Sequence, residues 1–249
     1  PYPSTLQLTP VLDTIVAGGK DADLRRMAEV MKAHAPQLVL LRWGHEMDLS
    51  GLYPWSANSP KMYIAAYRHV VSIFRDEGVT NVRWVWSPAG DPKAPEYYPG
   101  DDVVDYVGLT LLEDAGWNRL FALPEQSFAD AFSSKYDVLK TFGKPIIICE
   151  LGISGSAEHQ KSWLAQAAAS VSDFPLLRGL VYFNDINPRS KQVPTRPDWR
   201  LTAQGFAALD SAADLTAQPT SVSTLVANSG FLAATLQAPQ APGLEVSDH

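Results

Sequence analysis

The chain has 249 residues, of which 46% are hydrophobic, 27 are acidic and 20 are basic. Its net charge of -7 argues against nucleic acid or an anionic membrane as the main partner, and its length and composition suit one domain with a sizeable core. The single cysteine, Cys149, excludes an internal disulfide. The sequence contains no run of 18 apolar residues, so we predict no membrane-spanning helix.

Helical and strand patterns alternate along the chain. Residues 21–34 place apolar side chains on one helical stripe, and residues 37–43 follow as a buried strand. Ser59 and Pro60 begin the next predicted helix, because serine is a favourable cap and proline suits the first helical position. Further strands are predicted at residues 81–87, 101–112, 144–150 and 176–184, with helices at residues 128–143 and 159–174. This alternation, with strands rich in Val, Ile and Leu, is typical of a parallel α/β sheet.

The composition changes near residue 212 to one rich in Ala, Ser, Thr and Pro. We therefore predict an α/β domain over residues 1–211 and a C-terminal extension over residues 212–249. Within this extension, residues 221–227 and 231–238 are the two arms of a candidate hairpin. The last residues are predicted to form a flexible tail.

Polar side chains recur where the predicted strands end, in the pairs His45-Glu46, Trp86-Ser87, Cys149-Glu150 and Phe183-Asn184. The carboxyl ends of parallel strands share one rim, so Glu46 and Glu150 are expected to face each other across it. Two carboxylates are what glycosidic bond cleavage needs, since one protonates the leaving oxygen and the other attacks the anomeric carbon or activates water. Aromatic side chains that would stack on sugar rings lie nearby in the sequence: Trp43, Tyr53, Trp55, Trp84, Trp86, Trp117 and Phe183.

Three segments follow one another in a specific order: RWGHEMDLSGLYPW at residues 42–55, YYPGDDVVDYVGL at residues 97–109 and KPIIICELG at residues 144–152. The first resembles the acid/base motif of glycoside hydrolase family 26, the β-mannanase family, and the third resembles its nucleophile strand. The resemblance extends from about Ile15 to Leu209. It implies a (β/α)8 TIM barrel and retaining hydrolysis of a β-linked polysaccharide, without a cofactor.

The resemblance also assigns roles by position. Glu46 would be the general acid/base and Glu150 the nucleophile. His45 would orient a sugar hydroxyl or form a hydrogen bond near Glu150. Arg42 lies four residues before Glu46, faces the same side of the strand and would hold Glu150 charged.

Five aromatic or amide side chains complete the predicted substrate contacts. Tyr53 and Trp55 would form a platform beyond the cleavage point, and Phe183 and Asn184 would line the opposite, glycone side. Trp84 and Trp86 share one strand face, so we expect one in the core and the other in the site; Trp86 is counted among the substrate-binding residues.

The chain departs from the family pattern at several positions. Asp48 replaces the usual asparagine after His-Glu-Met, and Phe183 stands where a tryptophan is common. Residues 110–112 are Thr-Leu-Leu, where the family commonly has an aspartate and a tyrosine. These differences leave β-mannan, β-glucan and an exopolysaccharide open as substrates. They also leave open a second function, that of a polysaccharide-binding barrel with little or no catalysis.

Counting the His-Glu-Met strand as the fourth of a barrel leaves five clear strands. We therefore expect a barrel that is incomplete at its N-terminus. No metal site is predicted, because H-E-x-x-H would need a second histidine where Leu49 stands. We expect a secreted or periplasmic protein, although this chain has no signal peptide, and we leave its oligomeric state open.

Overall fold

The computed structural model describes residues 11–56, 58–187, 195–216 and 231–235. Its strands are β1 (Val39–Arg42), β2 (Val82–Trp86), β3 (Tyr106–Asp114), β4 (Ile146–Ser154), β5 (Leu177–Phe183) and β6 (Phe231–Thr235). The helices are α1 (Val11–Val16), α2 (Asp21–Ala33), α3 (Pro60–Asp76), α4 (Ala115–Phe121), α5 (Phe128–Leu139), α6 (Ala157–Ser170) and α7 (Ala203–Thr216). Three short 3-10 helices join them: η1 (Ala94–Tyr97), η2 (Lys140–Phe142) and η3 (Val171–Asp173).

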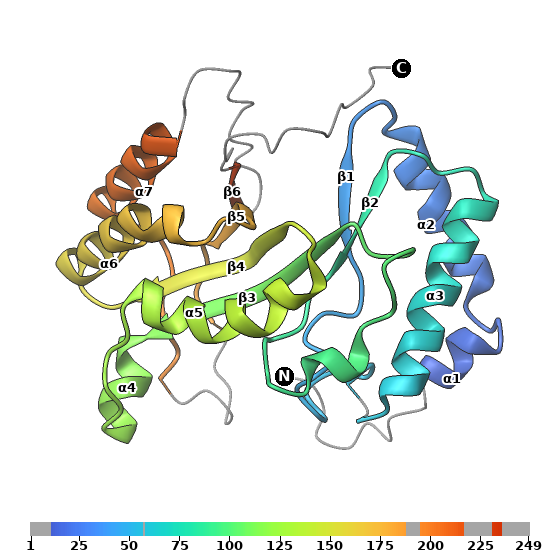
Figure 1. Ribbon diagram of the computed structural model, residues 1–249, viewed down its shortest axis with the longest axis horizontal. Helices are drawn as coiled ribbons and strands as arrows, with labels where there is room; N and C mark the ends of the chain where they lie inside the picture. Colours follow the sequence, from blue (N-terminus) through green and yellow to red (C-terminus); the bar gives the residue numbers. More distant parts are fainter. Residues whose placement is uncertain (1–10, 57, 188–194, 217–230, 236–249) are drawn as a thin grey trace.

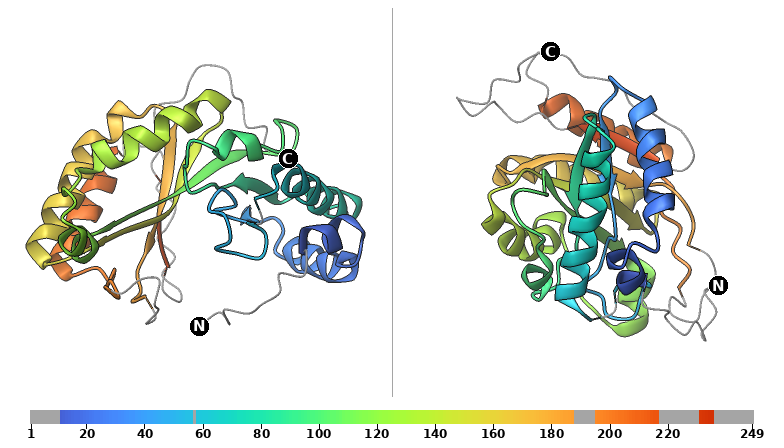
Figure 2. Two further views of the ribbon diagram at one scale, coloured as in Figure 1. Left: turned by 90° about the horizontal axis from the view of Figure 1, so that it is seen from below. Right: turned by 90° about the vertical axis from the view of Figure 1, so that its right-hand side faces the viewer.

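The strands form one sheet in the order β1-β2-β3-β4-β5-β6. The first five are parallel and neighbour one another in chain order, whereas β6 pairs antiparallel with β5. The sheet curls, and α3, α5 and α6 lie on its outer side (Figures 1 and 2). The predicted α/β architecture, an incomplete (β/α)8 barrel, is confirmed.

Local sequence signals explain where the helices begin. Helix α3 starts at Pro60, directly after Ser59, and buries the side of the helix that carries Tyr63, Tyr67 and Phe74. The hydroxyl of Ser156 accepts a hydrogen bond from the His159 N–H at 3.2 Å and so caps α6. An equivalent serine cap opens α5. These caps fix the residues at which α5 and α6 begin.

The core between the sheet and its helices is rich in aromatic rings. Trp84 of β2 meets Phe74 and Tyr67 of α3 edge-on, with ring centroids 5.1 and 6.0 Å apart. A second group of rings comes from α5, from α6 and from the residue after η3, and it contains Phe128, Phe132, Trp163 and Phe174. Burying side chains of this size stabilises the fold by about 25 cal/mol per Å² of apolar surface removed from water.

A β-bulge interrupts the pairing of β3 with β4. Leu109 pairs with Ile148 and the next residue, Thr110, pairs with Glu150, so Cys149 is an extra residue on β4. Such a bulge locally reorients the side chains that follow it. Beyond the bulge the two strands continue in register as far as Asp114 and Ser154. Glu150 is therefore placed by a local irregularity in a long, well-paired strand.

The C-terminal part of the chain joins the domain at two places. The predicted boundary between residues 211 and 212 falls inside α7, and β6 pairs with β5 along the edge of the sheet. Residues 217–230 and 236–249 lie outside the described residues, so the first arm of the predicted hairpin and the predicted tail are not described. Within the described ranges, no helix is long and apolar enough to cross a membrane.

Candidate active site

Glu46 lies in a tight turn that begins where β1 ends. Gly44 has φ 60° and Glu46 has φ 53°, a left-handed conformation that costs a residue with a side chain about 1–3 kcal/mol. The turn is fixed to the end of β2, because the Glu46 N–H donates to the Ser87 carbonyl oxygen at 2.8 Å. Glu46 is only 8% exposed. A buried carboxyl group on a strained backbone at the end of a strand is typical of a functional position.

Two stacked aromatic rings lie beside Glu46. Tyr53 and Trp55 are parallel within 10°, with centroids 5.0 Å apart, and the Tyr53 hydroxyl donates to the Glu46 carboxylate at 3.2 Å. Burial, and then the charge of Glu46, raise the pKa of Tyr53, so the phenol stays a protonated donor. Trp55 is itself held by a hydrogen bond of 2.7 Å from its indole N–H to the His45 carbonyl oxygen. The predicted aromatic platform thus adjoins the predicted acid/base.

Arg42, the last residue of β1, contacts residues of β3 and β4 and the residue directly after β2. Its guanidinium forms an ion pair with Glu150 of β4 and donates to the Ser87 hydroxyl at 2.8 Å and the Thr110 hydroxyl at 3.1 Å. The Arg42 and Glu150 side chains are 19% and 21% exposed, so the pair is partly shielded from water. A guanidinium in this arrangement holds the carboxylate of Glu150 in a fixed orientation.

Both carboxylates belong to one site. The imidazole of His45 lies 4.7 Å from the Tyr53 ring, and the charges of both Glu46 and Glu150 act on it. Burial, and then the neighbouring Arg42 charge, nevertheless lower the pKa of His45 below its usual 6.5. His45 is therefore a neutral hydrogen-bonding group at neutral pH. The structure brings together Arg42, His45, Glu46, Tyr53, Trp55 and Glu150.

Trp86 does not join this group, in contrast to our prediction. Its side chain is fully buried and meets the rings of Tyr98 and Phe142 edge-on at 5.0 and 5.2 Å. Trp84, on the same strand face, is also buried, so both tryptophans belong to the core. The face they share is covered by helices, which the strand pattern alone does not reveal.

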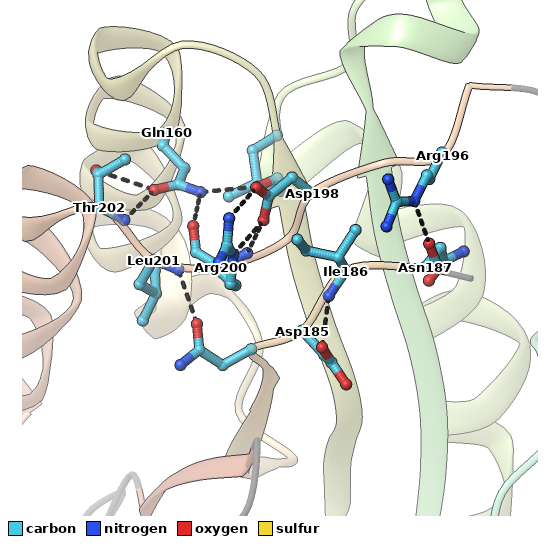
Figure 3. Close-up of polar contacts among 11 residues, drawn as sticks. Gln160, Asp185, Ile186, Asn187, Arg196, Asp198, Arg200, Leu201 and Thr202 are labelled. Carbon is cyan, nitrogen blue, oxygen red and sulfur yellow. Dashed lines mark hydrogen bonds and ion pairs between the residues drawn. The ribbon is translucent and has the colours of Figure 1, made fainter. Parts of the chain in front are cut away.

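The predicted glycone-side residues lie at the end of β5. Phe183 is partly buried and pairs in register with Phe231 of β6. The Asn184 amide oxygen accepts a hydrogen bond from the Leu201 N–H at 2.8 Å, which fixes the returning chain (Figure 3). Asn184 thus has a structural partner in this arrangement.

The chain that follows β5 is fastened by Gln160 of α6. This side chain is 1% exposed, donates to the carbonyl oxygens of Ile153 and Arg200, and accepts from the N–H and hydroxyl of Thr202 (Figure 3). All hydrogen-bonding positions of the buried amide are therefore used. Gln160 thus connects the end of β4 to the chain segment before α7.

Three residues contribute to the site in ways that the sequence did not predict. Ser87 holds both halves of it, because its carbonyl accepts from Glu46 and its hydroxyl accepts from Arg42. Thr110, which we noted only as a departure, accepts from Arg42. The thiol of Cys149 lies against Ser87 and Gly108, and burial raises its pKa, so it is a neutral packing group. Among the described residues, no cluster of three or more His, Cys, Asp or Glu could hold a metal ion.

Comparison with known proteins agrees with this geometry. The family model of Glycosyl hydrolase family 26 matches residues 8–122, which include Arg42, Glu46 and the aromatic platform. Endoglucanase H from Acetivibrio thermocellus is 32% identical over 200 residues, or 75% of this chain. The chain belongs to glycosyl hydrolase family 26. A beta-1,3-xylanase from a Vibrio species, TXYA, is 37% identical to this family 26 chain over 90 residues, or 33% of it.

Solved structures of the family share the fold. The GH26 beta-mannanase of Bacteroides ovatus matches with a TM-score of 0.55 and 20% identity, over 80% of this chain and 60% of its own. The Bacillus subtilis mannanase BCman matches with a TM-score of 0.55 and 24% identity, over 82% of this chain and 56% of its own. The family 26 chain described here spans 21% of the length of endoglucanase H and 19% of that of the Vibrio xylanase.

Proposed function

We propose that this chain carries the catalytic centre of a retaining endo-β-glycosidase that hydrolyses a β-linked polysaccharide. The observation that carries the proposal is the ion pair of Arg42 with Glu150 beside the Tyr53–Glu46 hydrogen bond. One carboxylate is held by a cation, as a nucleophile requires. The other lies at the end of β1 beside the Tyr53–Trp55 platform, where a general acid/base would meet the leaving glycosidic oxygen.

The proposed reaction has two displacements. Glu150 attacks the anomeric carbon while Glu46 gives its proton to the leaving glycosidic oxygen, which releases one part of the polymer and forms a glycosyl–Glu150 ester. Glu46 then takes a proton from a water molecule, whose oxygen replaces Glu150 at the anomeric carbon. Arg42 keeps Glu150 oriented for attack and stabilises it again when it leaves.

The substrate class is a neutral β-linked polymer. The stacked rings of Tyr53 and Trp55 offer flat apolar surface next to Glu46, which suits the apolar faces of sugar rings. β-Mannan is the first candidate, because the structural relatives are named mannanases. β-Glucan and β-1,3-xylan are the next candidates, because sequence relatives are named an endoglucanase and a beta-1,3-xylanase.

A polysaccharide-binding protein without efficient catalysis is the second candidate function. It is favoured by residues 110–112, where Thr110 contacts Arg42 and the following residues are leucines. Among the described residues, Arg42 is the only hydrogen-bond donor to the Glu150 carboxylate. A tyrosine at residues 110–112 would add a second donor, so the proposed nucleophile is less well stabilised in this chain.

A panel of mannan, mixed-linkage β-glucan and β-1,3-xylan separates the two functions. Wild type is expected to release reducing ends from one polymer, whereas Glu46→Ala and Glu150→Ala should lose this activity by a factor of about 10³ or more. Glu158→Ala, which alters an exposed glutamate at the start of α6, is the matched control. An activated 2-fluoro glycoside should label Glu150. Binding without release of sugar from any polymer would favour the second function.

A further inference from the structure

The turn that carries Glu46 is attached to the loop after β2 by Asp48. One oxygen of the Asp48 carboxylate accepts from the Ala89 N–H at 2.7 Å, and the other accepts from the N–H groups of Gly90 and Asp91 at 3.1 and 3.0 Å. Asp48 is 8% exposed. A buried carboxylate that binds three successive backbone N–H groups holds the two loops in one arrangement.

Lys135 of α5 holds the other side of the same loop. Its ammonium group donates to the Ala89 carbonyl oxygen, and its methylene stem covers Gly90, where an added Cβ would lie 2.8 Å from the Lys135 Cγ. Gly90 has φ 91°, a conformation that favours glycine. Both backbone groups of Ala89 are therefore bound: Asp48 accepts from its N–H, and Lys135 donates to its carbonyl oxygen.

The two side chains also compensate each other's charge. Burial lowers the pKa of Lys135, and the negative charges of Asp48, Glu46 and Asp91 act against this shift. A buried carboxylate without a neighbouring cation would be costly. Lys135 thus places a positive charge in the surroundings of both Asp48 and Glu46.

We propose that Asp48 and Lys135 act together as positioning residues that hold the strained turn of Glu46 at the rim. This inference rests on the proposed function. In this turn Glu46 is left-handed, and its N–H donates to the carbonyl oxygen of Ser87, two residues before Ala89. Whatever fixes residues 89–91 therefore helps to fix Ser87 and, through it, the backbone of the turn at Glu46.

Asp48→Ala is the most direct test. An alanine has no side-chain acceptor, so all three hydrogen bonds are lost. A displaced Glu46 delivers its proton poorly. We expect kcat/KM to fall about tenfold for a substrate with a poor leaving group but to change less than twofold for a 2,4-dinitrophenyl glycoside, which needs no proton.

Lys135 provides the second arm of the test. Lys135→Met should produce the same dependence on the leaving group, and Lys135→Arg, which keeps the charge and a donor, should restore part of the loss. Asp91→Asn is the matched control, because Asp91 is a nearby carboxylate whose side chain accepts from Lys93 and does not hold the turn. A merely structural role would lower both substrates' kcat/KM by the same factor, and that result would overturn the proposal.

Amide hydrogen exchange separates this inference from the proposed function. The N–H groups of residues 89–91 should exchange at least about tenfold faster in Asp48→Ala than in wild type, whether or not the protein is an enzyme. If wild type hydrolyses neither glycoside, the proposed function fails, and with it the catalytic role of the two residues, while faster exchange would still show that Asp48 holds the loop. Unchanged exchange would overturn the structural basis of the inference.

Discussion

Arg42 shows how much of the site depends on one side chain. The sequence predicted its contact with Glu150, whereas the structure adds two further acceptors, Ser87 and Thr110. Three acceptors on three different strands need a planar group with several donors in fixed directions, which arginine has and lysine lacks.

Arg42→Lys should therefore lower kcat/KM about 10- to 100-fold although it keeps the charge. The fall is expected because one ammonium group cannot hold Glu150 while it also binds both hydroxyls. Steady-state kinetics on the polymer identified by the panel would measure the effect. Arg83→Lys on β2 is the control, because Arg83 is exposed and donates only to backbone carbonyl oxygens. Equal activity of Arg42→Lys and wild type would contradict the importance of the planar guanidinium group.

His45 gives the site a dependence on pH. Its pKa in the folded protein is below the usual 6.5, so the unfolded chain binds a proton at a higher pH than the folded chain does. Neutral His45 therefore contributes to the free energy of unfolding above pH 6.5. This contribution is lost as the pH falls from about 6.5 toward the pKa of His45 in the folded protein.

We expect the thermal midpoint of wild type to fall between pH 7.5 and pH 5 by more than that of His45→Asn, which has no group to titrate there. Thermal unfolding followed by circular dichroism across this pH range would measure the difference. The groups that face His45, namely Arg42, Glu46, Tyr53 and Glu150, are unchanged in the comparison. Parallel curves for the two proteins would show that His45 is not held neutral.

At the scale of elements, the bulge in β4 is the feature on which Glu150 depends. Gly108 of β3 allows it, because an added Cβ would lie 2.6 Å from the Cys149 Sγ and 2.7 Å from the Ser87 Cβ. The strands can approach this closely only where one residue has no side chain. The bulge and Gly108 together set the position of Ser87, which in turn binds Arg42.

Gly108→Ala is expected to destabilise the protein by about 1–3 kcal/mol, the usual cost of overpacking a core, and to lower activity because Ser87 is displaced from Arg42. Urea unfolding and kcat/KM would measure the two effects. Adding Cys149→Ala removes the contact with the sulfur but leaves the contact with Ser87, so recovery should be partial. Full stability of Gly108→Ala alone would mean that the strands are not as close as the structure places them.

The order and type of the main elements could be predicted from the sequence, because each strand is a short apolar run between amphipathic helices. The bulge could not. Residue alternation assigns strand faces only while the pairing is regular, and Cys149 is the extra residue at which the pairing of β4 with β3 is interrupted.

Glu46 could be singled out because motif and strand end coincide there, whereas Glu150 could be singled out only by its motif, because β4 continues to Ser154. The hydrogen-bond partners of Asp48 could not be predicted, since the three N–H groups that it binds belong to a loop that follows another strand. Trp86 illustrates the opposite difficulty. Its residue type suits a sugar platform, but its neighbours Tyr98 and Phe142, which bury it, come from segments whose packing the sequence does not specify.

For the molecule as a whole, the sheet has an open side at β1. Within the part of the chain that the structure describes, β1 pairs with β2 alone, whereas β5 is covered by β6. Leu40 of β1 is 48% exposed, and Leu38 directly before the strand is 57% exposed. An apolar strand edge of this kind favours pairing with another chain.

We therefore expect the 249-residue chain to self-associate through β1, and Leu40→Lys to reduce this association, because a charged side chain disfavours burial at a strand edge. Light scattering over a range of protein concentrations would measure it, with the thermal midpoint as a check that the fold is kept. Val30→Lys is the matched control, since Val30 is 54% exposed but lies on helix α2 and not on the strand. If both variants reduce association equally, general surface apolarity is responsible; if only Leu40→Lys does, the backbone groups of β1 are the point of contact.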